Sequence, residues 1–203
     1  MSPPVHPRDA ASLVLQRHRG SGLEVLMGRR PPRDRFMPDV FVFPGGRVEP
    51  SDARLPVESL ITKRVATRLK TQGERSKARA LATAAIRETW EETGLIVGSL
   101  RAGRLQPNQA ALDYLGRAIT PAQSKIRYHA RFFTASAEQA HGKLAGNGEL
   151  IDLQWIPIEE ALRLPIIDVT DAILRHVQSI RPNARAQALF IHYRNGVQQI
   201  RPE

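Results

Sequence analysis

The chain of 203 residues is 41% apolar and 25% charged, carries a formal net charge of +10 at pH 7 and contains no cysteine. This length predicts one domain over residues 1–203 with a sizeable core, and the composition is ordinary for a soluble protein. The lack of cysteine excludes disulfides and thiolate metal sites. No apolar run is long enough to cross a membrane or to act as a secretory signal, so we expect a cytoplasmic protein with no membrane partner.

The basic residues are mostly arginines, whose guanidinium groups pair well with phosphates. They are dispersed along the chain, and no aromatic-rich nucleic-acid motif accompanies them. We therefore expect most of this charge to be solvated. The pattern disfavours nucleic acid as a partner and leaves room for a small phosphorylated ligand.

The first quarter of the chain is predicted to form short strands. Two of them, 11–17 and 23–29, are joined by a glycine-containing turn at 19–22, which is a hairpin signal. Residues 31–39 form a proline-punctuated loop, and 40–43 a short apolar strand.

Two helices are predicted next. Apolar residues at about helical spacing indicate a helix over 54–72, which Gly73 would end. Ser76 is the expected N-cap of a second helix that runs to Thr93, and Gly94 occupies the C-terminal position that glycine favours.

The rest of the chain alternates between predicted strands and helices. The expected strands are 95–100, 126–134 and 150–156, and the expected helical segments are 108–117, 159–164 and a helix starting near Asp168. A final hairpin, 187–193 with 197–200, turns at Asn195-Gly196. The order of elements predicts a mixed α/β (α+β) domain.

The stretch AAIRETWEETGL, residues 84–95, carries an unusual group of carboxylates. Glu88, Glu91 and Glu92 share one helical face, where they repel each other unless cations neutralise them. Hard divalent ions prefer such oxygen ligands and can bridge to phosphate. A solvated acidic face is the alternative, but the preceding Phe-Pro-Gly-Gly at 43–46 favours a functional site.

The two motifs together resemble the signature of the Nudix hydrolases, from GG-x-V-E at 45–49 to R-E-x-x-E-E-x-G-L at 87–95. These enzymes cleave a nucleoside diphosphate linked to another moiety, using a divalent metal ion and water. The resemblance covers about residues 10–165. It implies the Nudix fold, a mixed β-sheet sandwiched between helices, and Mg²⁺ or Mn²⁺ as cofactor.

Two features depart from the family signature. Asp52 stands where the signature has its first glutamate, and residues 53–86 separate it from Arg87 where the signature has seven residues. Thr89 also fills a position that is usually apolar. We expect 54–75 to form an extra helical insertion inside the Nudix box, because lengthening a loop has a modest entropic cost.

The resemblance also implies roles for the carboxylates. Glu88 and Glu92 match metal ligands of the family, and Glu91 matches either a further ligand or the base that deprotonates water. Glu149 lies in the loop before Trp155, where some members carry a glutamate that acts as base or ligand. A solvated loop carboxylate is an equally good interpretation of Glu149.

Two further residues of the signature have expected roles. Gly45 could offer its backbone carbonyl to the metal, because glycine lets the main chain approach closely. Arg87 is expected to orient the neighbouring carboxylates by ion pairing.

The segment before the glycines resembles an element of the coenzyme A diphosphatases, in particular their peroxisomal-type branch and its bacterial relatives. Arg30 and Arg35 fall on the two arginine positions of that element and are the expected substrate-binding residues. The alternative is that they cover the edge of the sheet or pair with Asp34 and Asp39. Three positions depart from the element, namely Gly28, Pro31 and Asp39.

Aromatic residues on the predicted strand 126–134 are candidates for stacking on a base. Strand alternation places Tyr128 and Phe132 on one face and Phe133 on the other. At least one of these sets is expected to belong to the ordinary core.

The leading hypothesis is a metal-dependent pyrophosphohydrolase acting on a small-molecule nucleotide-diphosphate substrate such as coenzyme A or acyl-CoA. ADP-ribose, NADH and dinucleotide polyphosphates are alternative substrates. A nucleotide-sensing module without turnover is the alternative from another class, although the three helix carboxylates of the signature are all present. The sequence leaves the oligomeric state open, a homodimer included.

Overall fold

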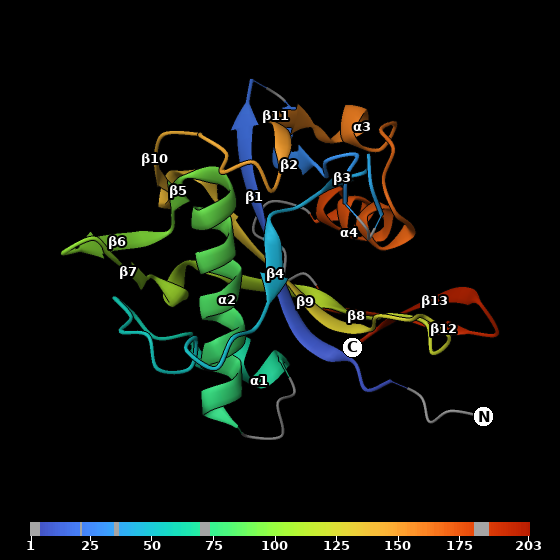
Figure 1. Ribbon diagram of the computed structural model, residues 1–203, viewed down its shortest axis with the longest axis horizontal. Helices are drawn as coiled ribbons and strands as arrows, with labels where there is room; N and C mark the ends of the chain where they lie inside the picture. Colours follow the sequence, from blue (N-terminus) through green and yellow to red (C-terminus); the bar gives the residue numbers. More distant parts are fainter. Residues whose placement is uncertain (1–4, 21, 35–36, 70–73, 181–186) are drawn as a thin grey trace.

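The computed structural model describes residues 5–20, 22–34, 37–69, 74–180 and 187–203. Its main feature is a nine-stranded mixed sheet, in which the strands of one continuous path are ordered β11-β2-β1-β9-β8-β12-β13, while β3 pairs with β2 and β4 with β1 (Figure 1). These strands are β1 (Arg8–Arg19), β2 (Gly22–Arg29), β3 (Phe41–Val42), β4 (Gly45–Arg47), β8 (Asp113–Ile119), β9 (Tyr128–Ser136), β11 (Ile151–Pro157), β12 (Leu189–Arg194) and β13 (Val197–Pro202).

The sheet is mixed because two of its strand pairs are parallel, β1 with β9 and β8 with β12, while the others are antiparallel. Two small two-stranded sheets lie outside it. They are formed by β5 (Leu95–Ile96) with β10 (His141–Gly142), and by β6 (Gly98–Arg101) with β7 (Arg104–Pro107). The two 3₁₀ helices are η1 (Gln109–Ala111) and η2 (Ala137–Gln139).

Helices pack on both faces of the large sheet. Alternation along β1 sends Leu13 and Leu15 into one apolar cluster and Val14 into another. The first cluster includes residues of α1 (Lys63–Arg68) and α2 (Arg75–Thr93), and the second those of α3 (Ile158–Ala161) and α4 (Asp168–Ser179). This arrangement confirms the predicted mixed sheet between helices. None of the helices in the described ranges is long and apolar enough to cross a membrane.

The predicted helix end and the predicted final turn, both of which need residues with positive φ, agree with the structure. Gly94 caps α2 in the left-handed conformation, with φ of 73°. Asn195 and Gly196 also have positive φ, 52° and 77°, as a tight turn between β12 and β13 requires. The predicted strands near the N-terminus and the helix near Asp168 are present as well.

The predicted helix over 54–72 was wrong in extent, and so was the idea of a mainly helical insertion over 54–75. Among the described residues 54–69, only α1 is helical, and it starts after Thr62, whose side chain accepts a hydrogen bond from Val65 N–H; residues 70–73 lie outside the described part of the chain. Upstream of it the backbone bonds elsewhere: Glu58 N–H donates to the Pro107 carbonyl. Pro56 adds to this outcome because it has no N–H to donate to a helix.

Two other predicted helix features were wrong. The segment around 108–117 is a 3₁₀ turn followed by β8, which is bonded on both sides, to β9 and to β12. A short apolar run cannot distinguish a buried strand from a helix, and here pairing decided for the strand. Ser76 lies inside α2, and Glu74 takes the N-cap position.

The segment between Asp52 and α2 contributes the side chains of Val65 and Leu69 to the core. Val65 and Leu69 are 0% and 1% exposed and pack in the same cluster as α2. We expect Leu69→Ala to lower the free energy of unfolding by about 2–5 kcal/mol, because it leaves a buried cavity. Urea denaturation would measure this. The matched change Leu60→Ala, at a side chain that is 64% exposed, should have almost no effect, and equal losses would contradict the packing described.

Candidate active site

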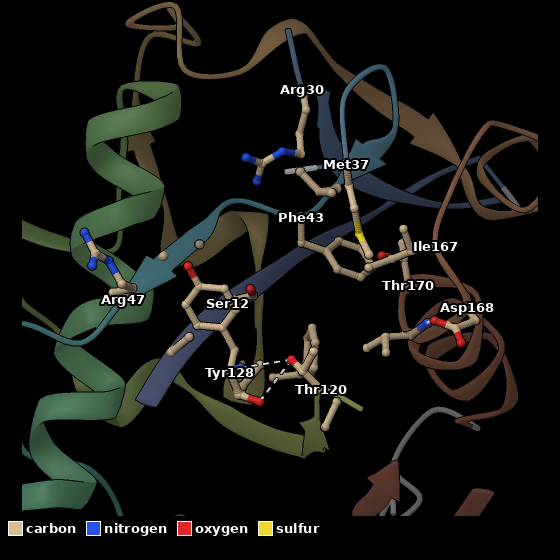
Figure 2. A pocket seen from close by; sticks show the side chains of 18 of the residues that line it. Ser12, Arg30, Met37, Phe43, Arg47, Thr120, Tyr128, Ile167, Asp168 and Thr170 are labelled. Carbon is tan, nitrogen blue, oxygen red and sulfur yellow. Dashed lines mark hydrogen bonds between the residues drawn. The ribbon is translucent and has the colours of Figure 1, made fainter. Parts of the chain in front are cut away.

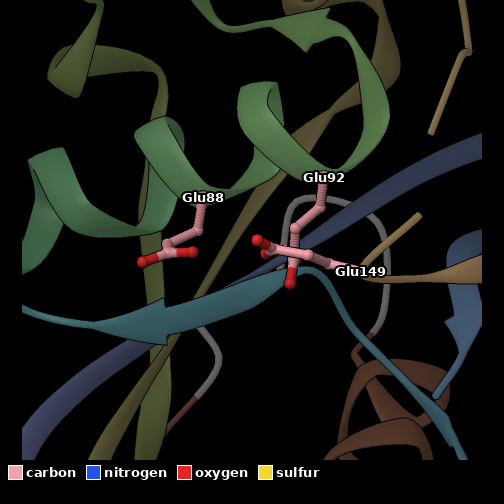
Figure 3. A group of neighbouring side chains, drawn as sticks. All are labelled: Glu88, Glu92 and Glu149. Carbon is pink, nitrogen blue, oxygen red and sulfur yellow. The ribbon is translucent and has the colours of Figure 1, made fainter. Parts of the chain in front are cut away.

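Three glutamates from two parts of the chain meet beside β4 (Figure 3). Glu88 and Glu92 lie one turn apart on α2, and Glu149 comes from the loop before β11. Each offers a carboxylate oxygen, and these oxygens all lie within 4.8 Å of one another. Glu92 is buried, Glu88 is half-buried and Glu149 is exposed, so the group runs from the interior to the surface.

The two glycines of β4 explain how a strand can lie so close to the acidic face of α2. A Cβ atom at Gly46 would lie 2.4 Å from a carboxylate oxygen of Glu88, closer than real side chains approach. The Gly45 N–H donates a hydrogen bond of 2.8 Å to Glu92 Oε2. Both glycines therefore help to position the carboxylates. Gly45 binds Glu92 through its N–H, and Gly46 leaves room for Glu88 because it has no side chain.

Arg87 joins three carboxylates. Its Nε and Nη2 contact the two oxygens of Asp52 at 2.8 and 3.2 Å, and its Nη1 lies 2.9 Å from both Glu88 and Glu91. Burial tends to lower the pKa of Arg87, but the Asp52 hydrogen bond and the three negative charges outweigh it and raise that pKa above its ordinary value. The guanidinium thus stays charged.

Asp52 still reaches Arg87, although residues 53–86 lie between them. Its side chain is 1% exposed, and its Oδ2 also accepts a hydrogen bond of 2.7 Å from Glu49 N–H. The described part of the intervening segment includes α1 and the first half of α2, and α2 places Arg87 beside Asp52. An aspartate therefore makes an ion pair with Arg87 from the position where the family signature has a glutamate.

Burial raises the pKa of the two helix glutamates of the cluster. Burial raises the pKa of Glu92 to about 8; the Gly45 N–H opposes the rise, Glu88 and Glu149 add to it, and Arg30 opposes it. Burial also raises the pKa of Glu88, against the charge of Arg87. Hard carboxylate oxygens that hold protons this firmly are suited to a divalent cation, which would replace the protons.

The other predicted site residues lie in different surroundings. The side chain of Glu91 is 43% exposed, pairs with Arg87 and is outside the cluster of three. Arg30 pairs with Asp34 at 2.9 Å, as the alternative interpretation expected, and it also lines the neighbouring pocket. Substrate binding by Arg30 stays a prediction. Arg35 lies outside the described residues.

A pocket of about 290 Å³ adjoins the carboxylates on the other side of β4, and Gly45 and Gly46 form part of its wall (Figure 2). Tyr128 and Phe132 also line it, while Phe133 is buried on the opposite face of the sheet against Tyr114, with ring centroids 5.9 Å apart. The predicted alternation of these aromatics is confirmed.

Several other pocket residues escaped the sequence-based prediction. Thr120, Asp168 and Tyr193 come from segments with no recognisable motif, and Arg47 fills the variable position of the GG-x-V-E motif.

Comparisons with known proteins agree with this fold. The family model of the NUDIX domain matches residues 6–177. A Nudix hydrolase from Alicyclobacillus acidocaldarius is 26% identical, with a TM-score of 0.65 over 86% of this chain and 92% of that one. The MutT protein from Bacillus halodurans is 19% identical, with a TM-score of 0.58 over 97% and 99% of the two chains. A comparison with curated protein sequences finds no match.

A further solved structure is similar in fold. The NUDIX domain of Shewanella oneidensis NrtR, crystallised with ADP-ribose, is 14% identical, with a TM-score of 0.53 over 86% of this chain and 88% of that one. At this identity the likeness concerns the fold alone.

The sheet between helices, the glycine pair and the glutamate-bearing helix together define a Nudix domain. The chain belongs to the Nudix family, whose model covers most of it. It is an enzyme of the pyrophosphohydrolase class, which uses divalent metal ions in general and binds small nucleotide-derived substrates.

Proposed function

We propose that this protein hydrolyses a diphosphate bond in a nucleoside diphosphate linked to another moiety, with Mg²⁺ or Mn²⁺ held by Glu88, Glu92 and Glu149. The observation that carries the proposal is the convergence of these three carboxylates at the edge of a pocket whose wall is formed by Gly45 and Gly46. When bound, the ions would activate a water molecule and stabilise the charge that develops on the pyrophosphate.

The chain's own residues would hold this arrangement in place. Arg87, anchored by the buried Asp52, restrains Glu88 and Glu91 through one nitrogen. We assign Glu91 to this restraint rather than to the metal, because it bonds Arg87 and lies outside the cluster, whereas Glu88 bonds Arg87 from within it. That leaves Glu149, exposed and within the cluster, for the role of base or outermost ligand.

The main chain at Gly45 would complete the support. Its N–H holds Glu92, and its carbonyl, on the same short strand, is the proposed backbone ligand. Because Gly46 has no side chain, substrate phosphate could approach Glu88 from the pocket without meeting a Cβ atom.

The pocket would hold the organic part of the substrate. Arg30 and Arg47 supply positive charge near the carboxylates, and Phe43, Phe132 and Tyr128 supply apolar surface for a base or an acyl-bearing group. Coenzyme A and acyl-CoA are proposed substrates because Arg30, an arginine of the element similar to coenzyme A diphosphatases, lines this pocket. ADP-ribose, NADH and dinucleotide polyphosphates fit the same general chemistry.

Incubation with a substrate panel tests the proposed function. The protein should release phosphorylated products from at least one of coenzyme A, ADP-ribose, NADH and diadenosine polyphosphates in the presence of Mg²⁺ or Mn²⁺, and from none in the presence of EDTA. Chromatographic analysis of the products also identifies which bond breaks. Survival of the whole panel, with some members still bound, would favour a sensing module instead.

A further inference from the structure

The end of the pocket far from the carboxylate cluster is built by α4 and the C-terminal hairpin. Ile167, Asp168, Val169 and Thr170 come from the start of α4, and Tyr193 comes from β12. Tyr193 lies beyond residue 177, where the match to the family model ends. Tyr193 is therefore a part of this wall that the family model does not cover.

The charge of the pocket changes sign from one end to the other. Arg47 lies on the side of α2, and Arg30 is close enough to Glu92 to lower its pKa, while Asp168 lies on the opposite side (Figure 2). Apolar and aromatic side chains, among them Phe43 and Phe132, separate the two ends. A ligand with its phosphates beside the glutamates would thus point its other end towards a carboxylate.

Two hydrogen bonds hold the Asp168 carboxylate. The Tyr193 hydroxyl donates to Oδ2 at 2.7 Å, and the Val169 N–H donates to Oδ1 at 2.8 Å. Burial, followed by the contact with Asp168, raises the pKa of Tyr193 above its ordinary value, so its hydroxyl remains a donor at neutral pH. An ionised carboxylate has about four acceptor sites, so Asp168 can still accept hydrogen bonds from a ligand.

The size of the pocket limits what reaches Asp168. At about 290 Å³ it lies just below the usual range for small-molecule sites, roughly 300–1,000 Å³, which is room for about one nucleoside-sized group inside the pocket. If the diphosphate lies over Gly45 and Gly46, the sugar or base of that group extends towards Asp168.

We propose that Asp168, positioned by Tyr193, makes the pocket select nucleoside groups whose distal end carries hydrogen-bond donors and no additional phosphate. The carboxylate accepts hydrogen bonds from hydroxyl or amino groups and repels a second phosphate. This inference rests on the proposed function for the placement of the diphosphate. Among the proposed substrates it favours NADH over NADPH, and dephospho-coenzyme A over coenzyme A when the adenosine half occupies the pocket.

Calorimetric titration with nucleotides that contain no diphosphate bond tests this selectivity without turnover. In Mg²⁺ at fixed ionic strength, the protein should bind AMP more tightly than adenosine 3′,5′-bisphosphate or 2′,5′-bisphosphate. Asp168→Asn keeps the acceptor for Tyr193 but removes the charge, and should reduce that preference by about twofold to fivefold, as expected for a solvent-exposed charge. Tyr193→Phe should reduce it less, because Asp168 is freed but remains charged.

A control and a second readout separate this inference from the proposed function. Asp171→Asn removes the same charge from the same helix, at a residue paired with Arg175, and should leave the preference unchanged. With NADH and NADPH as substrates, Asp168→Asn should change the ratio of their KM values. If hydrolysis fails but the AMP preference depends on Asp168, the inference stands and the proposed function falls. Equal binding of AMP and the bisphosphates, or an unchanged ratio in Asp168→Asn, overturns the inference.

Discussion

Replacing Glu92 with glutamine is expected to stop hydrolysis and at the same time to stabilise the metal-free protein. Activity should fall by more than about a hundredfold, because even residues that only support metal ligands contribute tenfold to a hundredfold. Stability should rise because glutamine can still accept the Gly45 hydrogen bond, while it removes a buried charge that lies beside Glu88 and Glu149.

The gain in stability depends on pH in a definite direction. In the folded metal-free protein Glu92 keeps its proton up to about pH 8, whereas the unfolded chain releases it near the ordinary value of 4.5. Wild-type stability should therefore fall as pH rises from about 4.5 to about 8, by an amount on the order of a few kcal/mol. Glu92→Gln should lose this part of the pH dependence.

Urea denaturation at pH 5 and pH 8, with EDTA or with Mg²⁺, measures these effects. The difference in the free energy of unfolding between the variant and the wild type should be large at pH 8 in EDTA and small at pH 5. Mg²⁺ should reduce this difference, because it stabilises the wild type by binding its folded form. Glu160→Gln, the same change at an exposed position on α3, is the matched control. If the variant and the wild type have the same free energy of unfolding at both pH values, the pKa of Glu92 is not raised in the folded protein.

Removing the guanidinium of Arg87 is expected to damage both stability and activity. Arg87→Ala leaves Asp52, which is 1% exposed, without its cationic partner, and the loss of one partner of a buried ion pair costs about 3–5 kcal/mol. It also releases Glu88, so activity should fall by about tenfold to a hundredfold, the usual effect of losing a group that orients a metal ligand.

A double-mutant cycle tests whether Asp52 acts through Arg87. Asp52→Asn and Arg87→Ala combined should cost less than the sum of the two single changes, because the residues are in direct contact. Arg175→Ala removes an exposed ion pair with Asp171 and should cost at most about 1 kcal/mol. Additive effects of Asp52 and Arg87 on the free energy of unfolding would show that the aspartate does not support the site.

The sequence predicted those features of the fold that depend on neighbouring residues, and it failed where residues distant in the sequence decide the conformation. The acidic face of α2, its stop at Gly94 and the turn at Asn195-Gly196 depend on neighbouring residues only, and each was predicted. Local patterns were insufficient for 108–117 and for most of 54–72, where strand pairing and distant backbone partners determined the conformation.

The sequence by itself determined that Glu88 and Glu92 share one helical face, because their spacing places them there whatever the rest of the chain does. Only the tertiary structure decided which carboxylate joins them. It brings Glu149 into the cluster, turns Glu91 towards Arg87, and returns Asp52 to Arg87 across residues 53–86. The physical reason is that close approach of segments distant in sequence depends on how the sheet and α2 pack, which local spacing does not encode.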